Sequence, residues 1–418
     1  MSPVQYDAIV VGARCAGSPT AMLLARKGYK VLAVDRATFP SDTISTHLIH
    51  PPGMMCLTRW GLKERVVGSN CPAIDNYKFD LGPFFLKGSP GTSDEPAAYG
   101  PRRTVLDKIL VEAAAESGVE VREAFTVDEI ISEGGRVTGI RGHARNGDSV
   151  TERAKVVIGA DGRNSIVARY VEPEQYNERP IQEASYYSYW SGLPMEGFEA
   201  YNRDDRAFAA WPTNDGLTLI VGGWPYAQFE QNRRDPEKNF MEMLDRAPEF
   251  GERVRAAKRE DRFMGAAVPN YFRKPFGPGW ALIGDAGYNK DPITAQGITD
   301  AFHDVERCVT AIDESLSGRR PFDAAMADYQ RARDEHVLPM YQFTCQLATL
   351  EPPPPRTQQL FAAIAGNQSA MDSFVQMNAG TISPAAFFAP ENIGAIMAAA
   401  HPTAGSQASR TTIALDAD

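Results

Sequence analysis

The sequence predicts an α/β fold in which a Rossmann-type nucleotide-binding domain carries an inserted antiparallel β-sheet and is followed by a C-terminal helical region. Three observations lead to this prediction. A strand, a glycine turn, a helix and a second strand follow one another within residues 7–35. Short aromatic runs separated by Pro, Gly and Asn-Asp turns then fill residues 181–271. From residue 321 onward, small and apolar residues recur at helical spacing.

The first nucleotide-binding segment begins with an apolar run at residues 7–11, which is typical of a parallel strand buried on both faces. Gly12 ends this strand, and a helix is expected from Gly17 to Lys27 with Gly28 as its C-cap. The run "YKVLAVDR" predicts a second strand that ends at Asp35. This order is the context that a dinucleotide fingerprint requires.

Further elements are expected along the rest of the chain. Helices are predicted at 105–117, at 297–316 and at 321–349, the last interrupted near Pro339 because proline breaks the helical hydrogen-bond ladder. Strands are predicted in "VEVREAFTVDEII", "RVTGIRG", "AKVVIGADG" and "GWALIGDAG", and in the inserted "ASYYSYWSGL", "RAFAAWP" and "LTLIVGGWP". Four prolines at 352–355 form a stiff connector to shorter helices.

These elements suggest a discontinuous domain organisation. Residues 1–78, 101–178 and 276–320 are assigned to the nucleotide-binding domain, and 79–100 with 179–275 to a substrate-binding sheet domain. Residues 321–400 form the C-terminal helical region, and 401–418 a flexible tail. Discontinuous domains of this kind place a ligand between the two units.

Composition narrows the classes of function. The chain has 418 residues, 43% of them apolar, and a formal net charge of −10, which argues against binding to nucleic acid or anionic membranes. Its five cysteines include no C-x-x-C pair, so neither a disulfide framework nor a zinc site is expected. No stretch is apolar enough to span a membrane. We expect a soluble cytoplasmic protein, either a monomer or a homodimer, with no bound metal.

The glycine turn "IVVGARCAG" departs from G-x-G-x-x-G because Arg14 replaces the second glycine. Such partial matches also occur where glycine serves only close packing. The case for binding is the start of the helix, where the free amides around Cys15, Ala16 and Gly17 suit a pyrophosphate. Asp35, followed by Arg36, could accept hydrogen bonds from ribose hydroxyls. Arg14 could contact a phosphate, but we favour an outward side chain on a backbone with negative φ.

A second motif identifies the nucleotide. The run "GWALIGDAGYNKDPITAQGITDAF" resembles the C-terminal flavin fingerprint of FAD-dependent aromatic hydroxylases, the p-hydroxybenzoate hydroxylase type of single-component flavoprotein monooxygenase, which is related to the geranylgeranyl reductases. The resemblance implies a Rossmann-type FAD-binding domain. It places Gly284 and Asp285 at the ribityl chain and Pro292 on the reactive face of the flavin. The amides around Gln296, Gly297 and Ile298 would face flavin N1 and O2, where a helix dipole stabilises the reduced ring. The family's G-D-A-A-H differs here, because Gly287 and Tyr288 follow Ala286.

Two other segments resemble the same family. "IGADGRNSIVAR" matches its D-G motif, which implies a role for Asp161 in supporting FAD and the visiting pyridine nucleotide, although Asp161 could also be only a turn and cap residue. "RRTVLDKILVEAA" matches a stretch whose arginine reaches FAD, which indicates Arg103, and Val127 falls where the family contacts adenine. These motifs extend over residues 7 to about 317 in the family's order. The sequence contains no second G-x-G-x-x-G motif, so a permanent NAD(P)H-binding domain is not expected.

The resemblance implies a reaction. Family members use NADH or NADPH as a transient reductant and then hydroxylate an electron-rich ring with O2 through a flavin C4a-hydroperoxide. We therefore expect an FAD-dependent monooxygenase acting on a small aromatic or polycyclic substrate. The expected substrate contacts lie in the insert: Tyr186, Ser188 and Trp190 share one face of a strand, and Phe208, Trp211 and Trp224 could add to either face. Packing of the sheet explains half or more of them equally well.

The loop "DTISTHLIHPPG" supplies the candidate catalytic histidine, His47, to act together with Pro292. An imidazole could deprotonate a phenol or bind the flavin, and Ser45 and Thr46 could contact the flavin ring. For His47, a structural role is as plausible as a catalytic role. For His50, a structural role is more plausible than a catalytic one. The helices after Pro355 could close over the pocket or form a dimer face.

Three other functions remain open. A geranylgeranyl-reductase-like enzyme would saturate double bonds, but its Trp-x-Phe-Pro signature is broken here because Pro212 follows Trp211 directly. A flavin-dependent halogenase is less favoured, since W-x-W-x-I-P is absent and no matching lysine stands out. A non-catalytic FAD protein that holds an aromatic ligand would bind without consuming oxygen.

Overall fold

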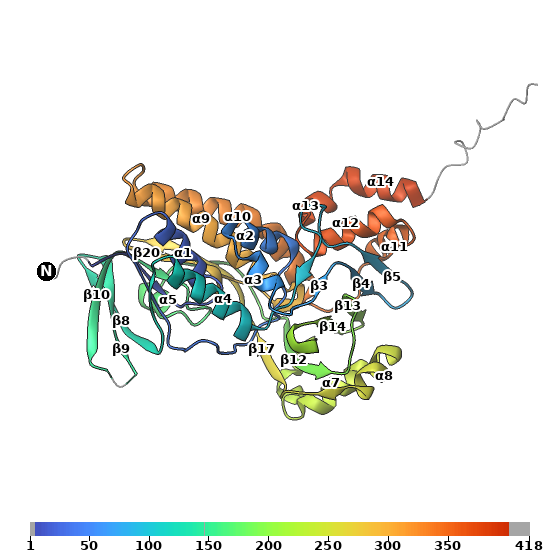
Figure 1. Ribbon diagram of the computed structural model, residues 1–418. Coiled ribbons are helices and arrows are strands. Elements are labelled where there is room, and N and C mark those ends of the chain that lie inside the picture. The colour runs from blue at the N-terminus through green and yellow to red at the C-terminus, as the bar shows by residue number, and fades with distance from the viewer. Residues whose placement is uncertain (1–4, 146, 401–418) are drawn as a thin grey trace, which may run out of the picture.

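The computed structural model describes residues 5–145 and 147–400 (Figure 1). It contains a mostly parallel sheet with helices packed on it, a second sheet inserted into that unit, and a group of helices at the C-terminal end. The predicted α/β class is therefore confirmed. The predicted tail at 401–418 lies outside the described residues.

The Rossmann-type sheet has the strand order β19-β20-β10-β1-β2-β7. Its strands are β1 (Tyr6–Val11), β2 (Val31–Val34), β7 (Glu120–Arg122), β10 (Ser149–Gly159) and β20 (Trp280–Leu282), all parallel, with β19 (Phe276–Gly277) antiparallel at the edge. The register aligns Val11 with both Val34 and Gly159, and Gly159 with Leu282. Four motifs that lie far apart in sequence therefore leave the same edge of the sheet, where open α/β sheets bind ligands.

Helices cover one face of this sheet. They are α1 (Gly17–Arg26), α2 (Pro51–Trp60), α3 (Lys63–Val67), α4 (Arg103–Glu116) and α9 (Gly297–Leu316). Ala8 and Val10 of β1 belong to the core on this side, whereas Ile9 and Val11 pack on the opposite side. That opposite face is covered by α5 (Ile166–Val171) and by the hairpin of β8 (Phe125–Glu133) and β9 (Arg136–Ala144). Burial on both faces explains why β1 is continuously apolar.

The inserted sheet has the order β16-β12-β15-β14-β13-β4-β5, with β17 also paired to β12. Its strands are β4 (Tyr77–Asp80), β5 (Phe85–Gly88), β12 (Glu183–Ser191), β13 (Phe198–Arg203), β14 (Arg206–Pro212), β15 (Thr218–Pro225), β16 (Lys258–Arg259) and β17 (Met264–Ala267). The prediction of an antiparallel sheet is correct except at one pairing, since β13 and β4 run parallel. They can do so because they come from separate chain segments and need no tight hairpin.

The insert also contains helices that the sequence analysis did not identify. The short helix α6 (Phe229–Asn232) comes first. It is followed by α7 (Pro236–Leu244) and α8 (Pro248–Ala256), which pack on one face of the inserted sheet. Figure 1 shows them on the side of that sheet away from α9. The side chain of Asp235 caps α7 by accepting from the Lys238 amide, and Pro236 occupies its first turn.

Short pairings connect the units. β3 (Ala73–Ile74) pairs with β6 (Ala98–Tyr99), and β18 (Asn270–Arg273) lies between β11 (Gln175–Arg179) and β21 (Tyr288–Asn289). Short 3-10 turns lie at η1 (Asn214–Gly216), η2 (Tyr226–Gln228), η3 (Gly284–Ala286) and η4 (Pro292–Thr294). The last two are within the predicted flavin motif, so this segment is a chain of tight turns rather than regular structure.

The C-terminal region is helical, as predicted. It consists of α10 (Phe322–Leu347), α11 (Pro355–Ile364), α12 (Gln368–Asn378), α13 (Pro384–Phe387) and α14 (Pro390–Ala400). The predicted interruption near Pro339 is wrong, because α10 continues through that residue. Packing of its flanking residues Val337 and Tyr341 against Phe272 and Tyr288 stabilises the helix on both sides of the proline. Of the described helices, none is long and apolar enough to cross a membrane.

Candidate functional site: a nucleotide cavity shared by three regions

A cavity of about 1670 Å³ lies where the three regions meet. Its walls are the carboxyl edge of the Rossmann-type sheet, one face of the inserted sheet and the helices after Pro321. Pockets for one small molecule usually have volumes of about 300–1000 Å³. The cavity therefore has room for a dinucleotide and a second ligand.

The glycine turn forms one end of the cavity. A Cβ on Gly12, whose φ is +97°, would lie 2.5 Å from the carbonyl oxygen of Ala160, and one on Gly17 would lie 1.7 Å from that of Gly12. Both glycines are therefore required by close backbone packing. The backbone amides of Cys15 and Ala16 border the cavity and donate to no acceptor among the described residues. Free amides at the start of α1 are suited to bind a phosphate group.

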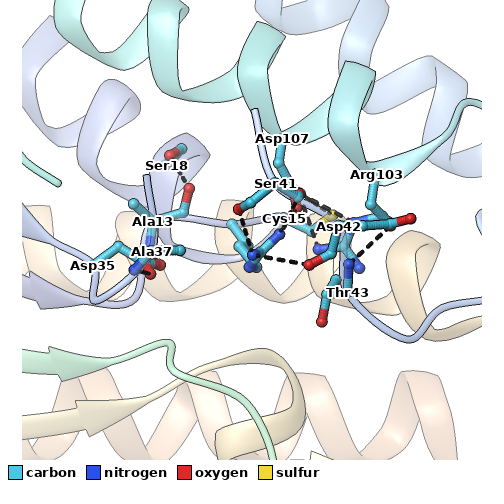
Figure 2. Close-up of polar contacts among 11 residues, drawn as sticks. Ala13, Cys15, Ser18, Asp35, Ala37, Ser41, Asp42, Thr43, Arg103 and Asp107 are labelled. Atoms are coloured by element: carbon cyan, nitrogen blue, oxygen red, sulfur yellow. Dashed lines mark hydrogen bonds and ion pairs between the residues drawn. The ribbon is translucent and has the colours of Figure 1, made fainter. Parts of the chain in front are cut away.

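The replacement of the second glycine by Arg14 now has a structural explanation. Arg14 does not have positive φ, so its Cβ is tolerated. Its guanidinium forms an ion pair with Asp107 of α4 and donates to the Ser41 hydroxyl at 2.9 Å. Figure 2 shows Ser41 and its loop beside Asp107. Arg14 borders the cavity, and its side chain holds the loop after β2 against α4. That it points away from a bound phosphate stays a prediction.

Asp35 closes the same turn. Its carboxylate accepts the Ala13 amide and the Ala37 amide, each at 2.8 Å, and it borders the cavity together with Arg36 (Figure 2). The two oxygens retain lone pairs for ribose hydroxyls. Val127 lies on the wall near this end, where the family resemblance places adenine.

Arg103 and Asp285 bring opposite charges to the middle of the cavity. Arg103 donates to Asp107 from Nε at 3.1 Å and from Nη2 at 2.9 Å. Asp107 is fully buried and forms ion pairs with the guanidinium groups of both Arg103 and Arg14, which compensate its negative charge. The exposed surface of Asp285 faces the cavity, and this enclosure raises its pKa against the opposing effect of the Arg103, Lys290 and Arg163 cations.

The turns after Asp285 lead to the start of α9. Gly284, Pro292, Gly297 and Ile298 border the cavity, as expected from the flavin motif. Gln296 does not: its side chain donates to the Asn378 carbonyl at 2.9 Å and so connects this turn to α12. The amide end of the long helix α9 is thus directed to the cavity.

Asp161 follows β10 on the same wall. Its Oδ2 accepts the Ile166 amide at 2.7 Å and so supports the start of α5, whose N-cap is Ser165, while its Oδ1 is buried without a donor among the described residues. Burial raises the pKa of this carboxyl. The structure supports this structural role, and the residue also borders the cavity.

The two loop histidines have different surroundings. His50 is satisfied by the Tyr77 hydroxyl at Nδ1 (2.8 Å) and the Thr294 carbonyl at Nε2 (3.1 Å), which supports a structural role. His47 is fully buried with φ +63°, and its Nε2 contacts the Tyr189 hydroxyl. It does not border the cavity, although Ser45 and Thr46 do. Burial and the cations of Arg103 and Arg102 hold its pKa well below the usual value, so this imidazole is neutral.

The predicted substrate face requires a correction. Tyr186, Trp190, Phe208 and Trp224 belong to the core between the inserted sheet and helices α7 and α8. Ser188 shares their face and donates to the Asp261 carbonyl at 2.7 Å. Alternation in a strand correctly separated the two faces, but only the helices determine which one is covered. Of the six residues, Trp211 and Phe208 border the cavity, Trp211 with its ring on the inner face.

The inner face carries residues that the sequence analysis missed as site residues. Tyr187 and Phe198 border the cavity, and the Tyr187 hydroxyl accepts the Ser45 amide at 3.3 Å. Burial raises the pKa of Tyr187 to about 12. Farther along the cavity, the wall becomes apolar and is formed by Leu347, Phe361, Phe374 and Phe388. The alternation in "ASYYSYWSGL" was the available signal for Tyr187.

Together these residues fit FAD. Unpaired amides at the start of α1 suit its pyrophosphate, Asp35 its ribose and Asp285 its ribityl hydroxyls. The start of α9 suits the pyrimidine end of the flavin ring. No group of three His, Cys, Asp or Glu side chains in the described part of the chain could hold a metal ion.

Comparison with known proteins agrees with this fit. The family model described as FAD binding domain matches residues 5–344. Among curated relatives, the tryptophan 2-halogenase of Chondromyces crocatus is 24% identical over 80% of this chain and 66% of its own length. The digeranylgeranylglycerophospholipid reductase of Methanocella arvoryzae is 25% identical over 78% and 83%. The 6-methylpretetramide 4-monooxygenase of Streptomyces rimosus is 25% identical over 78% and 79%.

A solved structure shows the same fold. The myxobacterial chondrochloren halogenase CndH superposes with a TM-score of 0.77 at 22% identity, covering 95% of this chain and 97% of its own. The family model covers most of the chain, including every motif that borders the cavity. The chain therefore belongs to the FAD binding domain family and is an FAD-dependent oxidoreductase.

Proposed function

We propose that this protein is a monooxygenase that uses NADH or NADPH and O2 to hydroxylate a small aromatic or polycyclic substrate. When bound, FAD supplies electron transfer and oxygen activation, which the side chains here cannot supply. The chain's residues hold the cofactor and exclude water from the reacting ring. Asp35, Arg103, Asp161 and Asp285 are proposed to bind FAD, with Pro292 next to its ring.

The observation that carries this proposal is the composition of the cavity wall. Its one lysine among the described residues, Lys290, is ion-paired with Asp300 and bonded to the Tyr288 hydroxyl. No free lysine is therefore available for halide chemistry of the kind the halogenases use. Aromatic side chains, by contrast, border the space beyond Pro292 and suit a flat apolar ring.

A second candidate is halogenation of the same kind of ring. It is favoured by the relatives, because the tryptophan 2-halogenase and the structurally similar CndH are both halogenases. The absence of W-x-W-x-I-P argues against it. Reduction of an isoprenoid double bond is a third candidate, favoured by the reductase relative but not by the broken signature at Trp211 and Pro212.

One experiment separates the three. The FAD-loaded protein is mixed in a stopped-flow instrument with NADH or NADPH, O2 and a panel of phenols, with and without chloride or bromide. A parallel arm without O2 contains an isoprenoid alkene, and mass spectrometry identifies the products. We expect faster flavin reduction in the presence of a bound phenol and a product that gains one oxygen atom. A halogenated product would overturn the proposal in favour of the second candidate, and anaerobic saturation of an alkene in favour of the third.

A further inference from the structure

Two carboxyl groups meet on the cavity wall between the flavin turn and the inserted sheet. Glu183 is the first residue of β12, and Asp291 immediately precedes Pro292. Both border the cavity, although only 4% of Glu183 and 1% of Asp291 is exposed. The two carboxyl groups are close enough for each to shift the pKa of the other. Buried carboxyl pairs in direct contact are uncommon unless the site uses them.

The chain is shaped to hold this pair. A Cβ on Gly223 of β15 would lie 2.0 Å from Glu183 Oε1, so the carboxyl occupies space that only glycine leaves open. The Ser185 hydroxyl donates to the same oxygen at 2.7 Å. On the other side, the Ile293 amide donates to Asp291 Oδ1 at 3.0 Å, and the Asp291 amide donates to Asn270 at 2.7 Å. In each carboxyl group, a hydrogen bond to one oxygen fixes the orientation of the group, and the other oxygen has no hydrogen-bond partner among the described residues.

The free oxygens, Glu183 Oε2 and Asp291 Oδ2, are buried and receive no donor from the described residues. The neighbouring cation, Lys290, is committed to Asp300, and the group that faces Asp291 from α10 is the thiol of Cys345. Two carboxylates in contact without a counter-ion cannot both be ionised, so they share a proton. Burial and the adjacent carboxyl raise the pKa of Glu183 well above its usual value, and burial raises the pKa of Asp291 to about 7.

We propose that Glu183 and Asp291 form an acid–base pair that accepts a hydrogen bond, and then a proton, from an O–H or N–H group of an electron-rich aromatic substrate. The step breaks the substrate's O–H or N–H bond, whose electron pair stays on the substrate. It forms an O–H bond on the carboxylate, and water later removes that proton. This inference rests on the proposed function and deepens it, because it names the substrate's recognition group. The inference applies whether the enzyme transfers oxygen or a halogen to the substrate, since both reactions require an activated ring.

The position of the pair supports this role. Asp291 joins the turn whose next residue, Pro292, is proposed to lie against the flavin, while Glu183 shares the inner face of β12 with Ser185 and Tyr187. A substrate ring lying between that turn and that face would bring its polar group next to these two side chains, which both border the cavity. With both protons bound, the pair offers no charged acceptor; with one proton, it does. Donor ligands should therefore bind more tightly as the pH rises through about 7.

The test uses binding without turnover. 2-Naphthol and 2-methoxynaphthalene, which lacks the O–H, are titrated by fluorescence into the oxidised FAD-loaded protein at pH 6 and pH 8. We expect the affinity for 2-naphthol to rise about tenfold between these values, as for one charge-assisted hydrogen bond. The affinity for 2-methoxynaphthalene should stay constant. Asp291→Asn, which removes the group whose pKa is about 7, should abolish the dependence, whereas Glu260→Gln, an exposed carboxylate of the same domain, should retain it.

A second measurement needs no ligand. Since the folded pair binds protons more tightly than the unfolded chain, stability should fall as the pH rises from about 4 through about 7. The melting temperature of Glu183→Gln should show a flatter profile. A 2-naphthol affinity that is equal at both pH values, or a pH dependence that survives in Asp291→Asn, would overturn the inference. Because neither measurement involves NAD(P)H, a protein that passes them but oxygenates no phenol would refute only the proposed function.

Discussion

The two ends of the cavity are held by different kinds of interaction. The nucleotide end depends on backbone geometry and on a compact charge network, in which Asp107 joins Arg14 and Arg103. The substrate end depends on aromatic packing between the inserted sheet and the C-terminal helices, as in the edge contact of Phe79 with Phe374. Substitutions at the nucleotide end should therefore act abruptly on FAD binding, whereas those at the substrate end should act gradually on substrate affinity.

The largest effect is expected from Gly12→Ala. The new Cβ would collide with Ala160 and also force an unfavourable φ, so we expect loss of FAD binding. Gly28→Ala is the matched control, because Gly28 has φ +91° but a Cβ added there would meet no atom within 4 Å. It should cost only about 1–2 kcal/mol and retain FAD. Flavin absorbance per chain and thermal unfolding measure both. Wild-type FAD content in Gly12→Ala would contradict the account.

Asp107→Asn should have the next largest effect. It removes the buried counter-ion of two guanidiniums, and uncompensated buried charge costs about 3–5 kcal/mol. Glu112→Gln, on the same helix and in an exposed pair with Lys108, should change stability by less than about 1 kcal/mol. Chemical denaturation compares the two. Equal losses of stability in the two variants would contradict the account, because the buried charge network at the nucleotide end would then contribute no more than an exposed ion pair.

The corrected sheet faces predict opposite outcomes for Trp224 and Tyr187. Trp224→Ala should destabilise the protein by about 3–5 kcal/mol through the cavity left against α7, with KM unchanged in the folded fraction. Tyr187→Phe removes the hydroxyl that accepts the Ser45 amide, so it should lower stability by only about 1 kcal/mol while shifting KM by about fivefold at the cavity wall. Denaturation and steady-state kinetics together decide. A KM effect in Trp224→Ala alone would restore the original assignment of the substrate face.

A modest effect is expected from Arg14→Gly, which restores the standard glycine fingerprint. Fingerprint matching alone predicts tighter FAD binding. The structure predicts about tenfold weaker binding, about 1.4 kcal/mol, because the loop at Ser41 loses its attachment to α4. Arg65→Ala, which removes an exposed pair with Glu116, is the control. Isothermal titration with FAD measures the change, and tighter binding in Arg14→Gly would refute the attachment.

Much of the nucleotide end could be predicted from sequence because its motifs are local. Gly12 and Asp35 follow strands directly, and Asp285 lies three residues after the end of β20, so finding the strands also located the residues. The helix from 297 to 316 was predicted with the bounds that the structure has, since its apolar stripe and its flanking turns agree.

The substrate end was less predictable because tertiary packing decides it. The strand alternation around Tyr186 and Tyr187 is the same whichever face is covered, and α7 and α8 settle the question. The pairing of Glu183 with Asp291 joins residues more than a hundred positions apart, which no local pattern indicates. Arg14 looked like a defect in a motif until Asp107 and Ser41 were placed beside it.

The most direct test of the central claim is a titration of flavin-stripped protein with FAD, monitored by calorimetry and by visible absorbance. The account predicts one FAD per chain, with affinity at least tenfold weaker in Asp285→Ala, where the cavity-facing carboxylate is lost. A wild-type protein that remained colourless, or an Asp285→Ala variant with unchanged affinity, would contradict it.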